Sequence, residues 1–331
     1  ALAPVLSLEP SVFTLGTQKI GSEFTRSAKV YNRGNDTLRI SSVTSTDTDI
    51  LSVSMDEMNI ASGEFADINL TITANSAGRN TANLQFQSNS SDQNNRSFAI
   101  EVIGYEGNFE SPTETGLPYS VIINDLKIDN TNLSVGSEIA LMADEQIVGL
   151  GVATGELPLT ITAWQQDQSN NLPGFSPGDS IKVKISTELY NEQVTVDSLN
   201  TFIEQGDGTY GTGAFTALRV SGNSGSTPSL RFDSSPLIFD DLPPGYTDTL
   251  RTWVYNDGKN NLDLNSVQAS GYFTVVEVEN YSIAENDSVY IDVMFSSNEV
   301  GINEGELSVS TSDPYNPRFE IQLWGRGLIS V

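Results

Sequence analysis

The sequence predicts an all-β protein of three tandem β-sandwich domains, two of them repeats of each other around a distinct middle β domain. Three observations support this: apolar and polar residues alternate in short runs, turn residues separate the runs, and one segment occurs twice. The chain has 331 residues, a length that suits two or three domains of about 100 residues, each with its own core.

The alternation is clear in residues 66–72, 98–102 and 288–293. Because side chains of a strand point alternately to its two faces, a period of two predicts half-buried strands. Clusters of Gly, Asn, Asp and Pro follow at roughly ten-residue spacing, the rhythm of a sandwich. No long stretch has helical periodicity, so we expect little helix.

The repeat joins residues 30–40, VYNRGNDTLRI, to residues 254–264, VYNDGKNNLDL. The flanking segments also match, so each copy spans a whole domain. Its Asn-x-Gly centre predicts a turn between two strands, in which Asn bonds the local backbone and Gly supplies a positive φ.

These residues resemble the ASH family of immunoglobulin-like (Ig-like) domains, which is related to the major sperm protein and Hydin-type modules. The second copy also has the closing motif of that family, with Asp313-Pro314 and Asn316-Pro317, whereas residues 88–95 replace it in the first copy. The resemblance implies an Ig-like fold that works as a spacer or binding platform.

The middle segment differs from both copies and resembles a module of multidomain secreted proteins of Bacteroidota and related marine bacteria. The matching text lies in residues 115–119, 172–179 and 206–213. This resemblance implies a bacterial protein that is extracellular or on the cell surface. The predicted boundaries are 1–105 for the first Ig-like domain, 106–220 for the middle domain, 221–228 for a small polar linker and 229–331 for the second Ig-like domain.

The composition makes several classes of function improbable for this chain. The formal net charge is −27, which repels nucleic acid and anionic bilayers, and no apolar run is long enough to span a membrane. We therefore expect neither nucleic-acid binding nor membrane insertion. The chain has no Cys and no His, which removes the commonest nucleophile and base pairs. We expect no catalytic residue, although two carboxylates could still form a glycosidase pair.

The middle domain holds the candidate ligand residues. Trp164 and Phe175, together with Tyr190, could form an aromatic platform for a sugar face, although the alternation around Trp164 favours core packing. Asp167 and Asp179 could bind Ca²⁺, the only cofactor considered, although solvated turn carboxylates are the plainer interpretation. Trp253 and Trp324 are expected in core or interface packing.

The predicted function is structural and non-catalytic: a segment of a surface scaffold or adhesin, or the subunit of a surface filament. In a filament, a terminal strand would complete a sheet of the next subunit; the candidate assembly residues are Ala1, Leu2, Val5, Leu6, Leu328 and Ile329. Their alternative role is to belong to their own domain. The second function is carbohydrate binding by the middle domain. The expected partners are therefore further protein copies, other surface proteins, or an extracellular polysaccharide.

Overall fold

The computed structural model describes residues 3–11, 13–54, 57–91, 95–233, 235–296 and 299–329. Within these ranges every regular element is a β-strand, so the all-β prediction is confirmed. The same ranges contain no helix that could cross a membrane. The residues form two compact units: the second contains the chain from Ser221 on, together with Lys127–Asn132 and Leu189–Glu192, and the first contains the rest.

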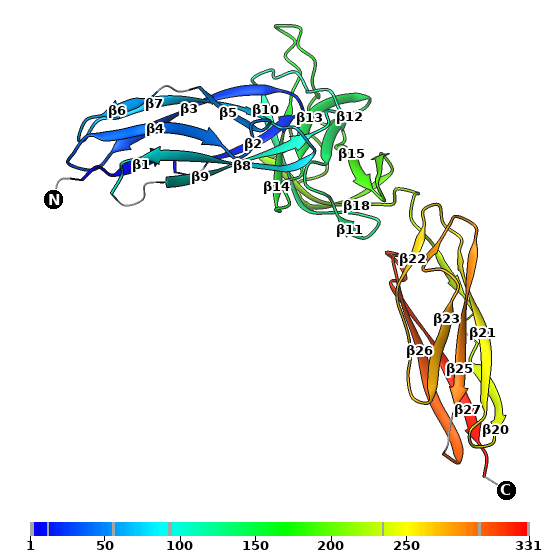
Figure 1. The fold of residues 1–331 in the computed structure, drawn as a ribbon. Coiled ribbons are helices and arrows are strands. Elements are labelled where there is room, and N and C mark those ends of the chain that lie inside the picture. The colour runs from blue at the N-terminus through cyan, green and yellow to red at the C-terminus, as the bar shows by residue number, and fades with distance from the viewer. Residues whose placement is uncertain are drawn as a thin grey trace. The chain divides into compact units, whose positions relative to one another are not determined.

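The N-terminal domain is a sandwich of two sheets (Figure 1). The four-stranded sheet runs in the order β1 (Leu6–Glu9), β3 (Glu23–Asn32), β7 (Phe65–Thr73) and β5 (Leu51–Ser54). The five-stranded sheet runs in the order β2 (Phe13–Lys19), β9 (Asn95–Tyr105), β8 (Gly78–Ser88), β4 (Leu38–Ser45) and β6 (Met58–Ile60). All pairs are antiparallel except β2 with β9, which are parallel. The inward residues of both sheets, such as Leu70 and Phe86, form one core.

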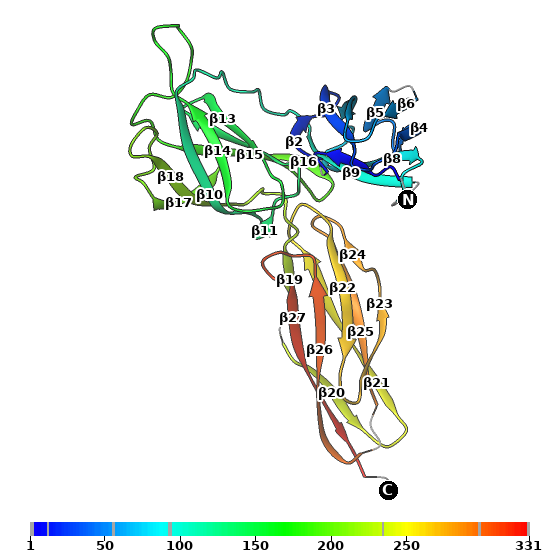
Figure 2. The ribbon, with the colours of Figure 1, turned by 90° about the vertical axis from the view of Figure 1, so that its left-hand side faces the viewer.

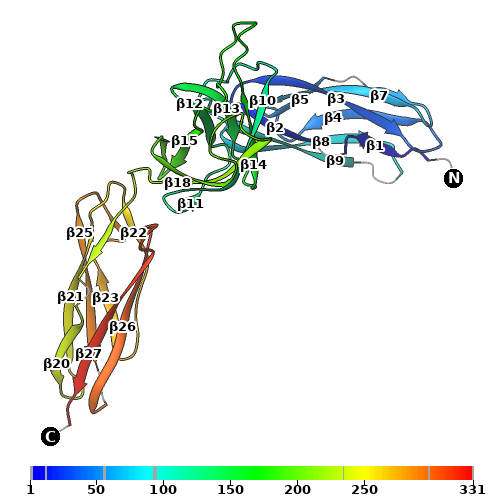
Figure 3. The same ribbon diagram turned by 180° about the vertical axis from the view of Figure 1, so that it is seen from behind.

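The C-terminal domain repeats this topology strand for strand (Figures 2 and 3). Its four-stranded sheet runs in the order β19 (Leu230–Phe232), β21 (Thr247–Asn256), β25 (Ser288–Ser296) and β23 (Phe273–Val278). Its five-stranded sheet runs in the order β20 (Leu237–Leu242), β27 (Arg318–Gly327), β26 (Gly301–Thr311), β22 (Leu262–Ala269) and β24 (Ser282–Ile283). Again one pair, β20 with β27, is parallel. The sequence repeat is therefore a repeat of fold.

The middle domain is built from one continuous nine-stranded sheet. Its order is β16 (Glu192–Val196), β15 (Lys182–Leu189), β12 (Glu138–Ala143), β13 (Gln146–Val152), β14 (Leu159–Trp164), β10 (Pro118–Ile128), β18 (Phe215–Gly222) and β17 (Leu199–Gln205), with β11 (Thr131–Asn132) paired to β10. Every residue of β12 is buried. Both faces of this strand are therefore covered, unlike the half-buried strands of the two repeats.

The Asn-x-Gly turn has a different role from the predicted one. It joins β3 to β4, and β21 to β22, which belong to opposite sheets, so it crosses the sandwich and forms no hairpin. Neither Gly34 nor Gly258 has a positive φ. Instead, a Cβ on Gly34 would lie 2.2 Å from the carbonyl oxygen of Ala3, and one on Gly258 would lie 2.4 Å from that of Thr227. Glycine is required because the preceding segment passes directly against the turn.

The closing motif of the second copy has a counterpart in the first, despite the different sequence. Buried Asp313 accepts the Leu230 amide at 2.8 Å through Oδ2. At the corresponding place in the first copy, the hydroxyl of buried Ser90 accepts the Leu6 amide at 2.9 Å. Both side chains attach the first strand of the domain to the loop before the last strand, so the apparent divergence preserves the contact.

Candidate functional site

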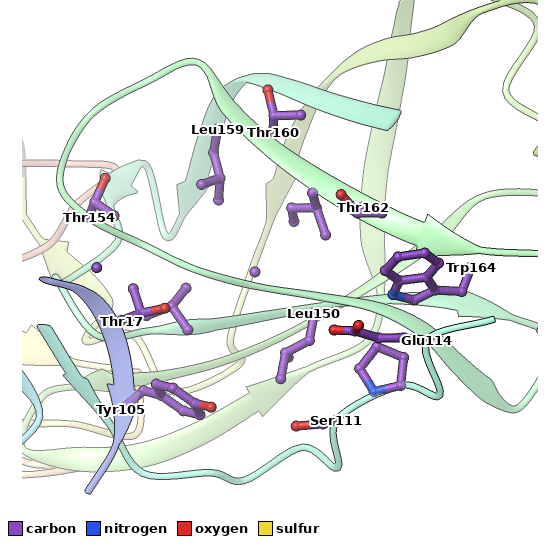
Figure 4. Close-up of a pocket in the computed structure, with 15 residues that line it drawn as sticks. Thr17, Tyr105, Ser111, Glu114, Leu150, Thr154, Leu159, Thr160, Thr162 and Trp164 are labelled. Carbon is purple, nitrogen blue, oxygen red and sulfur yellow. The ribbon is translucent and has the colours of Figure 1, made fainter. Parts of the chain in front are cut away.

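A groove of about 520 Å³ opens on the first unit beside β14 (Figure 4). The view shows Trp164 at one end, with Thr17 and Tyr105 at the other. The lining comes from β2, the end of β9, the segment that leads to β10, and strands β13 and β14 with the loop between them. Its polar side chains are those of Thr17, Tyr105, Ser111, Glu114, Thr154, Thr160, Thr162 and Trp164.

Strand β14 supplies the wall that carries Trp164. Ile161 and Ala163 are buried, whereas Thr160 and Thr162 are exposed and Trp164 is half-buried on the alternate side of the strand. Leu159 and Ile161 line the groove together with Thr160, Thr162 and Trp164. The expectation that Trp164 packs in the core is therefore wrong. The residues of this strand do alternate between buried and exposed. Trp164, however, lies on the same side as Thr160 and Thr162, which face outward.

Glycine on the neighbouring strand β13 lets the buried Ile161 side chain pack directly against its backbone. A Cβ on Gly151 would lie 2.6 Å from the Cδ1 atom of Ile161, too close for any side chain without movement of that core residue. Gly151 and Leu150 both line the groove. In the Gly-Leu-Gly sequence of β13, the two glycines allow close packing against neighbouring strands, and Leu150 between them lies in the groove lining.

A buried carboxylate fixes the segment that forms the opposite wall. Glu138, at the start of β12, is 1% exposed. Its Oε1 atom accepts the amides of Gly107 at 2.9 Å and Asn108 at 2.8 Å, and its Oε2 atom accepts that of Phe109 at 3.2 Å. Charge-assisted bonds of this kind are stronger than neutral ones. They hold the chain just before Ser111 and Glu114, so these groove residues start from an anchored backbone.

Glu138 also affects the hydroxyl at the far end of the groove. Burial, and then the negative charge of Glu138, raise the pKa of Tyr105 above its ordinary value. The phenol therefore stays protonated at neutral pH and can donate a hydrogen bond. The sequence analysis did not single out Glu138. The signal that could have indicated it is a single carboxylate at the start of the otherwise apolar segment 138–143.

Of the four predicted ligand residues, only Trp164 lines the groove. Phe175 is 1% exposed and stacks on Tyr210 with ring centroids 4.7 Å apart, so its face is covered. Tyr190, the third predicted ring, lies at a turn with a positive φ of 54° and is also absent from the lining. The structure therefore forms no platform from these three rings.

The two predicted calcium ligands are engaged in local turns. Asp167 accepts the Ser169 amide at 2.9 Å through Oδ1, and Asn170 Nδ2 at 2.6 Å through Oδ2. Bonds from these two residues lower its pKa below the ordinary value. Asp179 accepts the Ser176 amide at 2.7 Å. Across the described ranges, no three His, Cys, Asp or Glu side chains gather as a metal site.

The predicted assembly residues have different environments. Leu6 is completely buried in its own domain, and the Val5 carbonyl accepts the Arg33 amide at 2.7 Å. Leu328 donates its amide to the Leu242 carbonyl, whereas the Ile329 side chain is exposed. Ala1 and Leu2 lie outside the described residues.

Trp253 and Trp324 are not core residues of the C-terminal domain. They are 40% and 39% exposed and project from the outer faces of its two sheets. Trp253 meets Tyr290 of the neighbouring strand edge to face, with centroids 5.8 Å apart. Trp324 lies opposite Ile238 in the parallel pair. Both face outward because the buried positions of their strands have the opposite parity.

Comparison with known families agrees with the duplicated topology. The model of the HYDIN/CFA65/VesB-like Ig-like domain matches residues 4–101 and 228–326. The chain belongs to the HYDIN/CFA65/VesB-like Ig-like family. The matched stretches are the two repeats, and they confirm the predicted ASH- and Hydin-type resemblance. Ig-like folds serve many functions, so membership establishes β-domains without assigning a reaction.

Solved structures give distant similarities to this Ig-like chain. A Porphyromonas gingivalis W83 protein of unknown function is 11% identical, with 97% of this chain and 99% of that chain covered and a TM-score of 0.28. An ASH/PapD-like domain of human CEP192 is 15% identical over 32% of this chain and 89% of its own, with a TM-score of 0.25. The VesB protease of Vibrio cholerae is 12% identical over 88% and 96%, also with a TM-score of 0.25. No curated protein matches the chain.

Proposed function

We propose that this chain is a non-catalytic extracellular scaffold of a bacterial cell surface, an adhesin segment whose middle domain binds a polysaccharide in the groove beside Trp164. The first Ig-like domain contributes Thr17 and Tyr105 to this groove, and the second acts as a spacer. The observation that carries the proposal is the combination, in one groove, of an indole with a row of hydroxyl groups.

The chemistry of the groove suits a sugar. An aromatic ring covers the apolar face of a pyranose, while nearby polar groups bond its hydroxyls. Thr160 and Thr162 precede Trp164 at alternate positions on the same face of β14, and Ser111 and Tyr105 add hydroxyls from the other side. The groove opens at the surface, so a chain of sugars could reach it.

A panel of immobilised polysaccharides tests this function. We expect wild-type protein to be retained by at least one glycan, and Trp164→Ala to lose that retention while keeping its far-UV circular dichroism and unfolding midpoint. Trp253→Ala is the matched control, since it removes an exposed indole from an Ig-like domain and should bind normally. Equal binding by wild type and Trp164→Ala would exclude the groove.

The filament alternative has its own supporting observation, an exposed apolar cluster on the five-stranded sheet of the C-terminal domain. Ile238 and Ile302 are 72% and 70% exposed; Ile238 pairs with Trp324, and Ile302 lies diagonally across from it, two residues from Glu304, the direct partner of Trp324. At the positions of Ile302 and Trp324, the first copy has Arg79 and Glu101, which form an ion pair at 2.5 Å. Exposed clusters of this kind favour association.

Negative-stain electron microscopy separates the two functions. Filaments that disappear in an Ile302→Arg, Trp324→Glu variant would support assembly through this cluster. Single particles for both wild type and variant, at all concentrations, would exclude it.

A further inference from the structure

We infer that the groove beside Trp164 selects polysaccharides that carry free amino groups, because Glu114 supplies a carboxylate at the same end as the indole. This inference rests on the proposed function and specifies the class of sugar. Both side chains line the groove, and Figure 4 shows the Glu114 side chain directed into it at the Trp164 end.

The groove lining carries negative charge and no positive charge. Glu114 is the only charged side chain in the groove lining, which contains no Lys or Arg. The neighbouring cations are not at the Glu114 end: the Lys19 side chain packs against Gly107, and Arg79 pairs with Glu101 and donates to the carbonyl of Thr154, which lies at the other end of the groove (Figure 4). A uronic acid or a sulfated sugar would therefore meet a carboxylate with no compensating positive charge.

An ammonium group on a sugar fits this end of the groove in two ways. It can pair with the Glu114 carboxylate through charge-assisted hydrogen bonds, and a cation over the indole face is attracted by the ring quadrupole. N-acetylation removes the charge and both attractions while keeping the ring and its hydroxyls. The net charge of −27 adds a long-range field that draws polycations toward the chain.

That field is also the main confounding effect, because any acidic protein attracts a polycation. Short oligosaccharides and a matched charge control separate binding in the groove from attraction by the general field of the protein. Glu145, in the turn between β12 and β13, is an exposed carboxylate of the same domain that is absent from the groove lining. Replacing Glu114 or Glu145 with Gln changes the net charge equally, but only the first changes the groove.

The experiment is calorimetric titration of full-length protein with a glucosamine tetrasaccharide and its fully N-acetylated form. Wild type should bind the amino form more tightly, and Glu114→Gln should weaken that binding about fivefold, the upper range for an exposed ion pair. Binding of the acetylated form should not change, and Glu145→Gln should behave as wild type.

Other outcomes overturn the inference in distinguishable ways. Equal losses for Glu114→Gln and Glu145→Gln would attribute the preference to the general field of the protein. Binding of the acetylated form that depends on Trp164, without preference for the amino form, would reject the amino-sugar selectivity and leave the proposed function intact. Binding of neither tetrasaccharide, nor of any glycan on the panel, would reject both.

Discussion

Asn32 and Asn256 make the same four hydrogen bonds at the same position of the two Ig-like domains. Each is completely buried. Nδ2 of Asn32 donates to the carbonyls of Asp36 at 2.7 Å and Ile60 at 2.9 Å, and its Oδ1 accepts the amides of Gly34 at 3.0 Å and Val5 at 3.3 Å. Nδ2 of Asn256 donates to the corresponding carbonyls at 2.8 and 2.9 Å, and its Oδ1 accepts the corresponding amides at 3.0 and 3.1 Å. One side chain thus satisfies the backbone of three segments.

Replacement of Asn256 with Ala should therefore destabilise the C-terminal domain strongly. It leaves two carbonyls and two amides without this partner, and a buried group left unpaired costs about 1–3 kcal/mol. We expect a loss of about 2–4 kcal/mol in the free energy of unfolding, measured by urea denaturation with tryptophan fluorescence. Asn261→Ala, at an exposed position of the same turn, is the control and should lie within about 0.5 kcal/mol of wild type.

The correspondence of Asp313 with Ser90 predicts which substitutions the second copy tolerates. Asp313→Ala removes the acceptor of the Leu230 amide, together with the bonds from the Tyr315 and Asn316 amides at 2.8 and 3.0 Å. Asp313→Ser restores an acceptor of the kind that the first copy uses. We expect the Ser variant to unfold at a higher urea concentration than the Ala variant. Identical midpoints would show that the bond to the first strand contributes nothing.

Asp292 should make stability depend on pH. Its two oxygens accept Nε and Nη2 of Arg251 at 2.7 and 2.8 Å, and these bonds lower the pKa of Asp292. A carboxyl whose pKa is lower in the folded state stabilises the fold above its unfolded pKa of about 3.9, and this contribution is lost as pH falls through the folded pKa. The gap in thermal midpoint between wild type and Asp292→Asn should therefore shrink between about pH 5 and pH 2. Glu285→Gln is the control, and an unchanged gap would contradict the assignment.

Calcium binding at Asp167 and Asp179 stays a prediction, and thermal unfolding tests it. Since a ligand that binds only the folded state raises the midpoint, calcium should raise it relative to chelator in wild type but not in an Asp167→Asn, Asp179→Asn variant. We expect weak affinity, on the order of 10⁻⁴–10⁻³ M as in extracellular modules, because local donors already occupy these carboxylates. Equal midpoints in calcium and in chelator would reject the site.

The fold was largely predictable from the sequence because its signals are local. The alternation in residues 66–72 and 288–293 corresponds to β7 and β25, and the repeat located both Ig-like domains. The need for glycine at position 34 could not be deduced correctly, because it depends on the Ala3 carbonyl oxygen lying 2.2 Å from where a Cβ on Gly34 would be. That approach is set by tertiary structure, and a positive φ was the only local explanation.

The candidate site was predictable only in part, for a related reason. The sequence grouped Trp164 with the nearby rings Phe175 and Tyr190, but its partners in the groove, Tyr105, Ser111 and Glu114, come from a distant segment that β10 pairing and Glu138 bring there. Asp167 and Asp179 are predicted ligands because their segment is compressed between Trp164 and Phe175, and in the structure both accept bonds within their own turns. Sequence spacing indicates local turns well and long-range assembly poorly.

The parallel pairing of β2 with β9 determines how the N-terminal domain resists stretching. In the proposed role as a surface scaffold, the chain would be pulled at its ends, so tension would drag β2 backward from Phe13 and β9 forward from Tyr105. Because the strands are parallel, their hydrogen bonds bear this force together in shear, whereas a hairpin would open one bond at a time. The parallel pair of β20 and β27 gives the C-terminal domain the same arrangement, with its hydrogen bonds loaded in shear. Single-molecule pulling should therefore show two high rupture forces of similar size per chain, and low forces would indicate that the domains peel open instead.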